Sequence, residues 1–381
     1  MKIAIIGLGI VGRGVYDIIQ SEPSSSVSVK YVMDIRRVEG VTCEYASSIE
    51  QIVKDKEIEL VVEAMGGLHP AYEYVSAALK AGKHCVTPNK QLISSMYSEL
   101  TELARKNGVS LRFTAAAGGG IPWLYNLKRT KRCSSISSLC GIINGTTNFI
   151  LDSMAKTGGA FDDILKQAQQ LGYAEANPSA DIDGIDLQRK CAISANIAFN
   201  AQIAPEQVDT MGIRYITAES IQCFAAMGRV CKLMCQAKRG SDNRIAAYVE
   251  PELFSLDDLE ANVVGNNNFV SLEGEYVGRL SFYGQGAGRY PTAHSLVEDI
   301  LDVQRGNIDN AESVSDIEVD NNSVAERYFV DASDYDFLNG ITLERLGNGV
   351  VTEEITVSQM HQRAAKQLSE GKRVFFAAIR L

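Results

Sequence analysis

The first twelve residues constrain the fold more than any other part of the chain. An apolar run typical of a strand leads into the turn GLGIVG, residues 7–12, and then into a helical pattern, and Asp34 ends the next apolar run. Strand, glycine-rich turn, helix and a later acidic residue together form the context in which such a turn binds a dinucleotide. Its first glycine allows the tight turn, its second leaves room for the pyrophosphate, and its third lets helix and strand approach closely. We therefore expect cofactor contacts from Gly7, Gly9, Ile10, Val11 and Gly12.

The sequence leaves the choice of cofactor open. Asp34 can accept hydrogen bonds from an adenosine ribose, which favours NAD. Arg36 and Arg37 follow it and can instead hold the extra phosphate of NADP. The simpler alternative is a Rossmann-like domain that binds no dinucleotide.

Patterns along the chain predict two domains and a smaller C-terminal segment. The first third alternates apolar β-branched runs with helical patterns, which predicts a parallel sheet covered on both faces. The region from Arg129 onward has long helical patterns over 161–172, 187–199 and 220–237, followed by strands with alternating polar residues over 246–254 and 269–284. A further helix is expected from Thr292, and the polar stretch 306–323 reads as a linker.

We therefore expect an α/β, Rossmann-type doubly wound nucleotide-binding domain over 1–128 plus about 288–305. A second, α+β domain for substrate binding and dimerisation is expected over 129–287. The linker and a small C-terminal α+β segment take up 306–381, with two or three strands and a helix over 358–371.

Charge and cysteine content exclude several classes of function. Lys plus Arg number 37 against 47 Asp plus Glu, a net charge of -10 with no compensating basic cluster, so we expect no nucleic-acid partner. No apolar run approaches the ~18 residues of a membrane span, so we expect no membrane partner. The eight cysteines form no CxxC pair, which disfavours a zinc ribbon or disulfide scaffold and fits a reducing cytoplasm. Cys231 and Cys235, four residues apart, are expected on one helix face.

An unusually acidic segment, GYAEANPSADIDGIDLQRK, spans residues 172–190. If a helix starts near Asp183, Asp186 and Lys190 lie one turn apart on the same face. Three interpretations remain open: a solvated salt bridge, a carboxylate cluster that binds a divalent cation, or carboxylates that recognise an ammonium group while the lysine donates a proton to a carbonyl oxygen. The spacing alone does not choose among them.

Several separate strings resemble homoserine dehydrogenase. They are VTPNK (86–90), GGGIP (118–122), GIINGTTNFIL (141–151), the acidic segment, and GQGAGRYPTAHSLVEDIL (284–301), in collinear order within residues 1–305. The resemblance implies interconversion of L-homoserine and L-aspartate 4-semialdehyde with NAD or NADP, in threonine and methionine biosynthesis. The rival interpretations are another amino-acid semialdehyde or sugar oxidoreductase, and a cofactor-sensing regulatory protein that kept the fold and lost the chemistry.

The resemblance also implies roles for individual residues. Lys190 looks like the proton donor, and Lys90 would lie near nicotinamide and substrate. The substrate would contact Glu175, Asp186, Asp181, Gly145 and Thr146. Further cofactor contacts would come from Asp34, Arg36, Lys90, Gly172 and Gly288. A homodimer formed through the second domain is implied as well.

Two departures from the family pattern put family properties in doubt. Family members often carry a glutamate where Thr114 stands, and that glutamate helps to hold a sodium ion with backbone carbonyls that correspond here to Ala117, Gly119 and Ile121. Threonine-sensing ACT domains follow a βαββαβ order, but the strand expected at 326–333 is followed by YDFLNG, which is too short for a full helix. Any such C-terminal domain is therefore expected to be truncated or altered.

Overall fold

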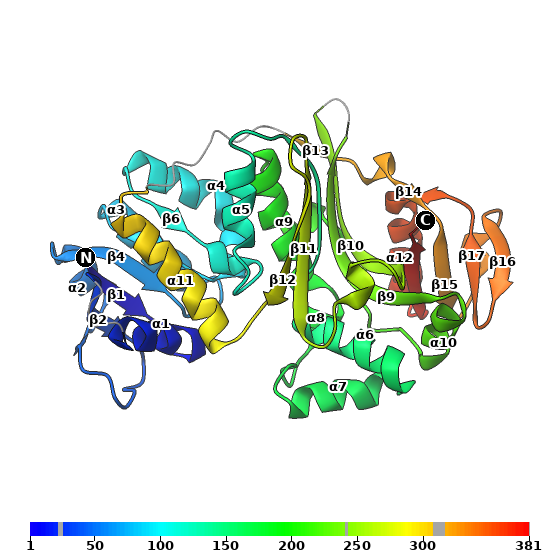
Figure 1. The fold of residues 1–381 in the computed structure, drawn as a ribbon, viewed down its shortest axis with the longest axis horizontal. Coiled ribbons are helices and arrows are strands. Elements are labelled where there is room, and N and C mark those ends of the chain that lie inside the picture. The colour runs from blue at the N-terminus through cyan, green and yellow to red at the C-terminus, as the bar shows by residue number, and fades with distance from the viewer. Residues whose placement is uncertain (22–25, 241–242, 308–316, 381) are drawn as a thin grey trace. The chain divides into compact units, whose positions relative to one another are not determined.

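The computed structural model describes residues 1–21, 26–240, 243–307 and 317–380, and the chain divides into two compact units (Figure 1). The first unit comprises residues 1–129, 196–202 and 285–316, and the second comprises 130–195, 203–284 and 317–381. Residues 308–316 of the expected linker lie outside the described residues.

The first unit is built on a six-stranded sheet. Its strand order is β3 (Glu44–Tyr45), β2 (Ser28–Met33), β1 (Lys2–Ile6), β4 (Ile58–Glu63), β5 (His84–Val86) and β6 (Leu111–Arg112). All of its described pairings are parallel. The order 3-2-1-4-5-6 is that of doubly wound dinucleotide-binding sheets, so the expected fold class is confirmed.

The helices of the first unit come from both ends of its sequence. They are α1 (Ile10–Ser21), α2 (Ile49–Lys54), α3 (Ala71–Lys80), α4 (Lys90–Lys106), α5 (Trp123–Thr130) and α11 (Arg289–Gln304). Ile3 and Ile5 of β1 share one buried cluster with Val15 of α1 and with Leu296 and Ile300 of α11. The strands read as continuous apolar runs because side chains on both faces of β1 are buried. The helix expected from Thr292 is present and begins at Arg289.

The second unit is built on a mixed sheet of eleven strands. Its main path runs β12 (Gly278–Gln285), β11 (Asn267–Gly274), β7 (Ile136–Ile142), β9 (Arg229–Arg239), β10 (Arg244–Ser255), β19 (Val374–Ile379), β15 (Tyr328–Ala332), β17 (Gly349–Thr352) and β16 (Thr342–Leu346). Two short strands, β8 (Asp209–Thr210) and β13 (Glu318–Val319), pair with β10. A separate pair joins β14 (Ala325–Glu326) to β18 (Ile355–Thr356).

The described helices of the second unit are α6 (Gly145–Thr157), α7 (Phe161–Gln170), α8 (Ser179–Ile182), α9 (Ile185–Phe199), α10 (Ala218–Ala226) and α12 (Val357–Ser369). Helix α9 begins two residues after Asp183, as the acidic segment predicted, and its last residues belong to the first unit. It places Asp186 and Lys190 one turn apart.

The prediction of one long helix over 220–237 is wrong. Helix α10 ends at Ala226, Gly228 adopts the left-handed conformation with φ 67°, and residues 229–239 form β9. The apolar spacing fits a helix, but pairing with β7 on one side and β10 on the other overrides it. Cys231 and Cys235 therefore lie on a strand.

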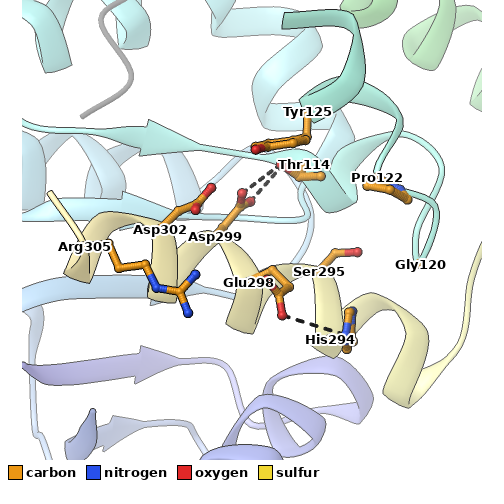
Figure 2. Close-up of a pocket in the computed structure, with 10 residues that line it drawn as sticks. All are labelled: Thr114, Gly120, Pro122, Tyr125, His294, Ser295, Glu298, Asp299, Asp302 and Arg305. Atoms are coloured by element: carbon orange, nitrogen blue, oxygen red, sulfur yellow. Dashed lines mark hydrogen bonds and ion pairs between the residues drawn. The ribbon is translucent and has the colours of Figure 1, made fainter. Parts of the chain in front are cut away.

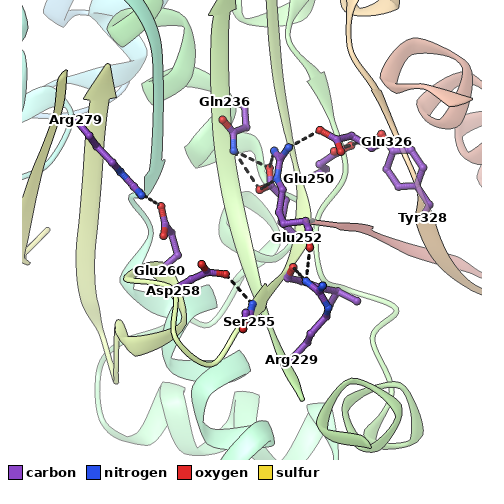
Figure 3. Close-up of polar contacts among 12 residues, drawn as sticks. Arg229, Gln236, Glu250, Glu252, Ser255, Asp258, Glu260, Arg279, Glu326 and Tyr328 are labelled. Carbon is purple, nitrogen blue, oxygen red and sulfur yellow. Dashed lines mark hydrogen bonds and ion pairs between the residues drawn. The ribbon is translucent and has the colours of Figure 1, made fainter. Parts of the chain in front are cut away.

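The C-terminal residues extend the sheet of the second unit. Strand β19 pairs in parallel with β10 and antiparallel with β15, and a short 3-10 turn at Asp336–Leu338 follows β15 in place of a helix, as expected. Arg380, just after β19, binds the buried carboxylate of Glu252 through Nε–Oε2 (2.7 Å) and Nη2–Oε1 (2.8 Å). Gln236 of β9 donates to the same carboxylate at 3.0 Å (Figure 3). A buried ion pair thus joins β10 to the end of the C-terminal strand.

Candidate active site

The glycine turn of the first unit has the geometry that its sequence predicts. Gly7 has φ 86° and donates its N–H to the Met33 carbonyl at 2.8 Å. A Cβ on Gly12 would lie 2.0 Å from the Gly7 carbonyl oxygen, whereas a Cβ on Gly9 would meet nothing within 4 Å. The turn therefore excludes side chains at its first and third glycines and leaves open space at the second, where α1 begins with Ile10 and Val11.

Asp34 is built into this turn. Its Oδ2 accepts the Leu8 N–H at 2.6 Å and its Oδ1 accepts the Arg36 N–H at 2.9 Å. Only 8% of the Asp34 side chain is exposed, against 73% for Arg36. The Arg37 guanidinium lies 5.2 Å from the centroid of the Tyr45 ring. Arg36 therefore extends into solvent, whereas Arg37 stacks on the protein.

Lys90 is the first residue of α4, directly after the loop that follows β5. Asn89 caps this helix by accepting the Leu92 N–H at 3.0 Å, and its amide donates to the Gly67 carbonyl at 2.6 Å. The fully buried Glu63, at the end of β4, accepts a hydrogen bond from Thr87 Oγ1 at 2.5 Å. These contacts fix the carboxyl ends of β4 and β5 beside Lys90. Sequence reasoning missed Glu63 because nothing distinguishes it from an exposed strand-end acid.

A cavity of about 290 Å³ in the first unit lies beside Thr114. Figure 2 shows that α11 supplies one wall with its acidic and basic side chains, and the segment from Thr114 to Tyr125 supplies the other. Asp299 is buried, and its two carboxylate oxygens accept the Thr114 N–H at 3.0 Å and hydroxyl at 2.7 Å. Burial raises the pKa of Asp299 to about 6. The Gly119 carbonyl accepts a hydrogen bond from Ser295 Oγ at 2.7 Å.

Lys190 and Asp186 form a buried ion pair in the second unit. Lys190 Nζ lies 2.7 Å from Asp186 Oδ2, with 10% and 3% of the two side chains exposed. The same ammonium donates to the backbone carbonyl of Ile143 at 2.6 Å. The solvated salt bridge is therefore wrong as an interpretation: the pair exists, but it lies inside the protein.

An asparagine that sequence reasoning did not single out joins this pair to a second carboxylate. Asn144 Nδ2 donates to Asp181 Oδ1 at 2.7 Å and to Asp186 Oδ2 at 2.9 Å. The signal for it was present, because Asn144 opens the NGTTN string. Lys190, Asp186 and Asp181 are thus brought together around one side-chain amide.

Gly145 and Thr146 open helix α6 next to this cluster in the chain. A Cβ on Gly145 would lie 2.7 Å from the Asn266 carbonyl oxygen, so the backbone at this position is closely packed. The Thr146 hydroxyl donates to the Tyr173 carbonyl at 2.5 Å, which ties α6 to the loop before Glu175.

Glu175 and Gly172 lie on that loop, which follows α7. Both residues are exposed, and the structure gives the Glu175 carboxylate no hydrogen bond or ion pair with the described residues. Gly172 has φ 76° and Gly288, before α11, has φ 126°, so both occupy backbone conformations that favour glycine.

Comparison with known proteins decides the family. Residues 122–301 match the family model for homoserine dehydrogenase, and residues 7–114 match the model for its NAD-binding domain. A homoserine dehydrogenase of Synechocystis sp. is 39% identical over 316 residues, covering 80% of this chain and 73% of that protein. The chain belongs to the homoserine dehydrogenase family.

Solved homoserine dehydrogenases share the fold. The crystal structure of the enzyme from Thiobacillus denitrificans has a TM-score of 0.87 at 31% identity and covers 100% of this chain and 98% of that one. A hyperthermophilic archaeal homoserine dehydrogenase, solved in complex with NADPH, has a TM-score of 0.70 at 25% identity and covers 82% of this chain and 100% of that one.

The predicted activity is therefore confirmed at the level of the family. The chain is an NAD(P)-dependent oxidoreductase, a homoserine dehydrogenase with a Rossmann-type nucleotide-binding domain. The comparisons favour homoserine dehydrogenase over the alternatives of another amino-acid semialdehyde or sugar oxidoreductase and of a sensor without catalytic chemistry.

Proposed function

We propose that Lys190 donates the proton to the aldehyde oxygen as an ammonium during reduction, and withdraws it from homoserine as a neutral amine during oxidation. The bound dinucleotide supplies or accepts the hydride, and the protein has to stabilise the charge that develops on oxygen. A buried ammonium suits this task because it can both neutralise an oxyanion and release a proton. The observation that carries this proposal is the fixed position of Lys190 Nζ, between Asp186 and the Ile143 carbonyl.

Asp186, Asp181 and Glu175 are proposed to bind the α-ammonium group of the substrate. That cation needs carboxylate partners once it leaves water. Two of these carboxylates already share the Asn144 amide, which supports their acting together. Glu175 lies on an exposed loop, so its part in the site depends on ligand binding. Gly145 and Thr146 are proposed to line the same site from the start of α6.

The cofactor is proposed to lie along the glycine turn, with its pyrophosphate over Gly9 and the N-terminus of α1. The open space at Gly9 supports this position. Lys90 follows β5 in a doubly wound sheet, where ligands bind at the carboxyl ends of strands. We assign it to the nicotinamide and substrate, and Gly172 and Gly288 to further cofactor contacts.

Both cofactors are proposed as substrates, with Arg36 holding the extra phosphate of NADP. Asp34 is already committed to the backbone of its own turn, and the exposed Arg36 projects beside it. The NADPH complex of the archaeal relative is consistent with this use. Asp34 can still accept a ribose hydroxyl through its remaining lone pairs.

The sodium site at the carbonyls of Ala117, Gly119 and Ile121 stays a prediction. Two of these carbonyls already accept hydrogen bonds, Gly119 from Ser295 and Ile121 from Trp123. The nearby carboxylate of Asp299 is bonded to Thr114 through both oxygens. Among the described residues, no three His, Cys, Asp or Glu side chains gather as metal ligands would. We derive no catalytic step from this ion.

A cytoplasmic homodimer is the proposed assembly. The end of the second unit's sheet exposes Tyr276 (77%), Tyr283 (56%) and Val277 (43%), which suits an interface. All eight cysteines are free, as a reducing compartment favours. Within the described part of the chain, no helix has the length and apolarity needed to cross a membrane.

Initial rates with L-homoserine and each of NAD and NADP test the proposed activity. We expect turnover of L-homoserine with at least one of the two cofactors. Glycerol and amino acids that lack the side-chain hydroxyl, offered as control substrates at the same concentration, should give no turnover. Absence of turnover with both cofactors would contradict it.

A further inference from the structure

Asn144 occupies a junction in the second unit. It follows β7, precedes α6 as its N-cap, and is buried, with 4% of its surface exposed. Its Oδ1 accepts the Thr147 N–H at 2.8 Å, which satisfies one of the unpaired N–H groups at the start of the helix. A capping asparagine needs only this oxygen. The other end of the side chain is therefore available for a different task.

The orientation of the amide follows from its partners. Carboxylate oxygens accept hydrogen bonds and cannot donate them when ionised, whereas the backbone N–H of Thr147 can only donate. A flipped amide would place its oxygen against Asp181 and Asp186 and its NH₂ group against the Thr147 N–H. The observed arrangement, with Nδ2 toward the two carboxylates, is the one that satisfies every group.

The same contacts connect Asn144 to Lys190. Asp186 Oδ2 accepts both from Asn144 Nδ2 at 2.9 Å and from Lys190 Nζ at 2.7 Å. The ammonium also donates to the carbonyl of Ile143, the residue that precedes Asn144. The backbone of Ile143 therefore contacts Lys190, and the side chain of the next residue, Asn144, contacts Asp186, the carboxylate partner of Lys190.

We propose that Asn144 is a positioning residue, which holds Asp181 and Asp186 side by side in their ionised forms and thereby sets the site that receives the substrate's ammonium beside Lys190. The inference rests on the proposed function of these three residues. Two carboxylates placed close together repel each other, and each would take up a proton more easily. Hydrogen bonds donated to both carboxylates favour their charged forms and lower the pH at which either is protonated.

Three other charged groups lie near Asp181 and Asp186 in the chain or in space. Lys190 on α9 pairs with Asp186. Asp183 follows α8 and forms its own ion pair with Arg214 at 2.6 Å, and Glu175 lies on the preceding exposed loop. The Asn144 amide is a neutral donor that reaches both carboxylates.

Asn144→Asp separates positioning from helix capping. Aspartate is as good an N-cap as asparagine and keeps the oxygen that accepts from Thr147, but it removes both donated hydrogen bonds and adds a third carboxylate. We expect the KM for homoserine to rise at least tenfold at pH 7, with the KM for the dinucleotide within twofold of wild type. Ammonium binding needs ionised carboxylates, so the acid limb of kcat/KM should move to higher pH by about one unit.

Asn148→Asp is the matched control. It makes the same chemical change one turn along the same helix, at a buried asparagine whose amide donates to the carbonyls of Val263, Gly265 and Asn267. We expect a changed Tm and an acid limb within 0.3 unit of the wild-type position, on the order of measurement error. An equal shift of the acid limb in both variants would assign the effect to α6 as a whole and overturn the proposal.

Asn144→Asp with wild-type KM and pH profile would also overturn it, and would leave Asn144 as a helix cap alone. Lys190→Ala, measured in parallel, keeps the two claims apart. If Lys190→Ala loses turnover while Asn144→Asp keeps the wild-type KM and pH profile, the positioning role of Asn144 is rejected and Lys190 remains the proton donor. If Lys190→Ala turns over normally while the pH profile of Asn144→Asp is shifted, Lys190 is rejected as the proton donor and the positioning role of Asn144 remains.

Discussion

At the residue scale, the acids proposed for one task stand in opposite surroundings. Asp186 is buried and bonded to Lys190 and Asn144, whereas Glu175 is exposed on a loop. Replacing an acid that is exposed in the absence of substrate should weaken substrate binding and leave the fold unchanged. Substitution of Glu175 therefore tests substrate binding more directly than substitution of Asp186, which would also break buried contacts.

Glu175→Gln keeps the shape of the side chain and removes its charge. If the carboxylate meets the α-ammonium of homoserine, the KM for homoserine rises at least tenfold, roughly 1.4 kcal/mol, while the KM for the dinucleotide and the Tm stay as in wild type. Steady-state kinetics at saturating cofactor measure this. An unaltered homoserine KM would assign Glu175 to the solvent-exposed surface.

The two arginines after Asp34 form a matched pair for testing cofactor choice. Arg36→Ala removes the exposed guanidinium and should raise the KM for NADP by about tenfold, with little effect on NAD. Arg37→Ala removes a side chain that stacks on Tyr45, so it should change the KM for NAD and the KM for NADP equally. Both changes should be smaller than the effect of Arg36→Ala on the KM for NADP. Equal effects of Arg36→Ala on NAD and NADP would show that Arg36 does not meet the phosphate.

At the scale of the element, the turn between β1 and α1 contains one glycine that is closely packed against the protein and one that faces open space, where a ligand can bind. Gly12→Ala would place a methyl group 2.0 Å from the Gly7 carbonyl, so we expect loss of stability of about 1–3 kcal/mol. Gly9→Ala meets nothing within 4 Å and should fold normally, yet raise the KM for the cofactor if the pyrophosphate lies there. Thermal unfolding and cofactor kinetics of both variants check this, and a normal cofactor KM in Gly9→Ala would move the pyrophosphate elsewhere.

Sequence patterns predict a helix, strand or turn well where its conformation depends mainly on neighbouring residues in the chain. The glycine turn, the parallel sheet of the first unit and the start of α9 after Asp183 follow from chain geometry and periodicity. The prediction of a helix through Cys231 failed because sheet neighbours far apart in sequence decide that segment. The alternating polar residues of β10 likewise suggest one exposed face, whereas Glu250 and Glu252 are fully buried by partners from the C-terminal segment.

One of these partners gives a prediction about pH. His361 on α12 lies 2.9 Å from Glu250, and burial lowers the pKa of His361 to about 4 and raises the pKa of Glu250 well above 4.5. These shifts favour a neutral histidine and a protonated glutamic acid in the folded protein, whereas in the unfolded chain the histidine holds its proton to higher pH than the glutamate. The contributions of the two groups to the pH dependence of stability therefore have opposite signs.

His361→Gln removes the compensating group. Because burial raises the pKa of Glu250, the folded variant holds this proton to higher pH than the unfolded variant does, so its stability falls as pH rises. Relative to wild type, the free energy of unfolding of the variant should therefore fall as the pH rises from 5 to 6. Urea unfolding of both proteins at the two pH values measures this. A pH-independent difference would mean that Glu250 is ionised in the folded variant.

At the scale of the whole molecule, the sequence motifs gave the activity more directly than they gave the site. Residues 1–305 carry the strings that identify the family, and the family comparisons confirm the enzyme class. The motifs predicted site roles for Lys190, Asp186 and Asp181 but not for Asn144. The contact between this helix cap and acids some forty residues later in the chain depends on tertiary structure. Glu63 was not predicted for the same reason, because its partner Thr87 lies at the end of a neighbouring strand.

The central claim is that Lys190 moves the proton in homoserine oxidation and aldehyde reduction. Its most direct test is the turnover number of Lys190→Ala with homoserine at saturating cofactor, beside the dissociation constant of the cofactor. We predict a fall in kcat of about two to four orders of magnitude, the usual range for a general acid, with cofactor affinity within a factor of about two. A kcat within threefold of wild type would contradict the claim and return Lys190 to a buried ion pair with a structural role alone.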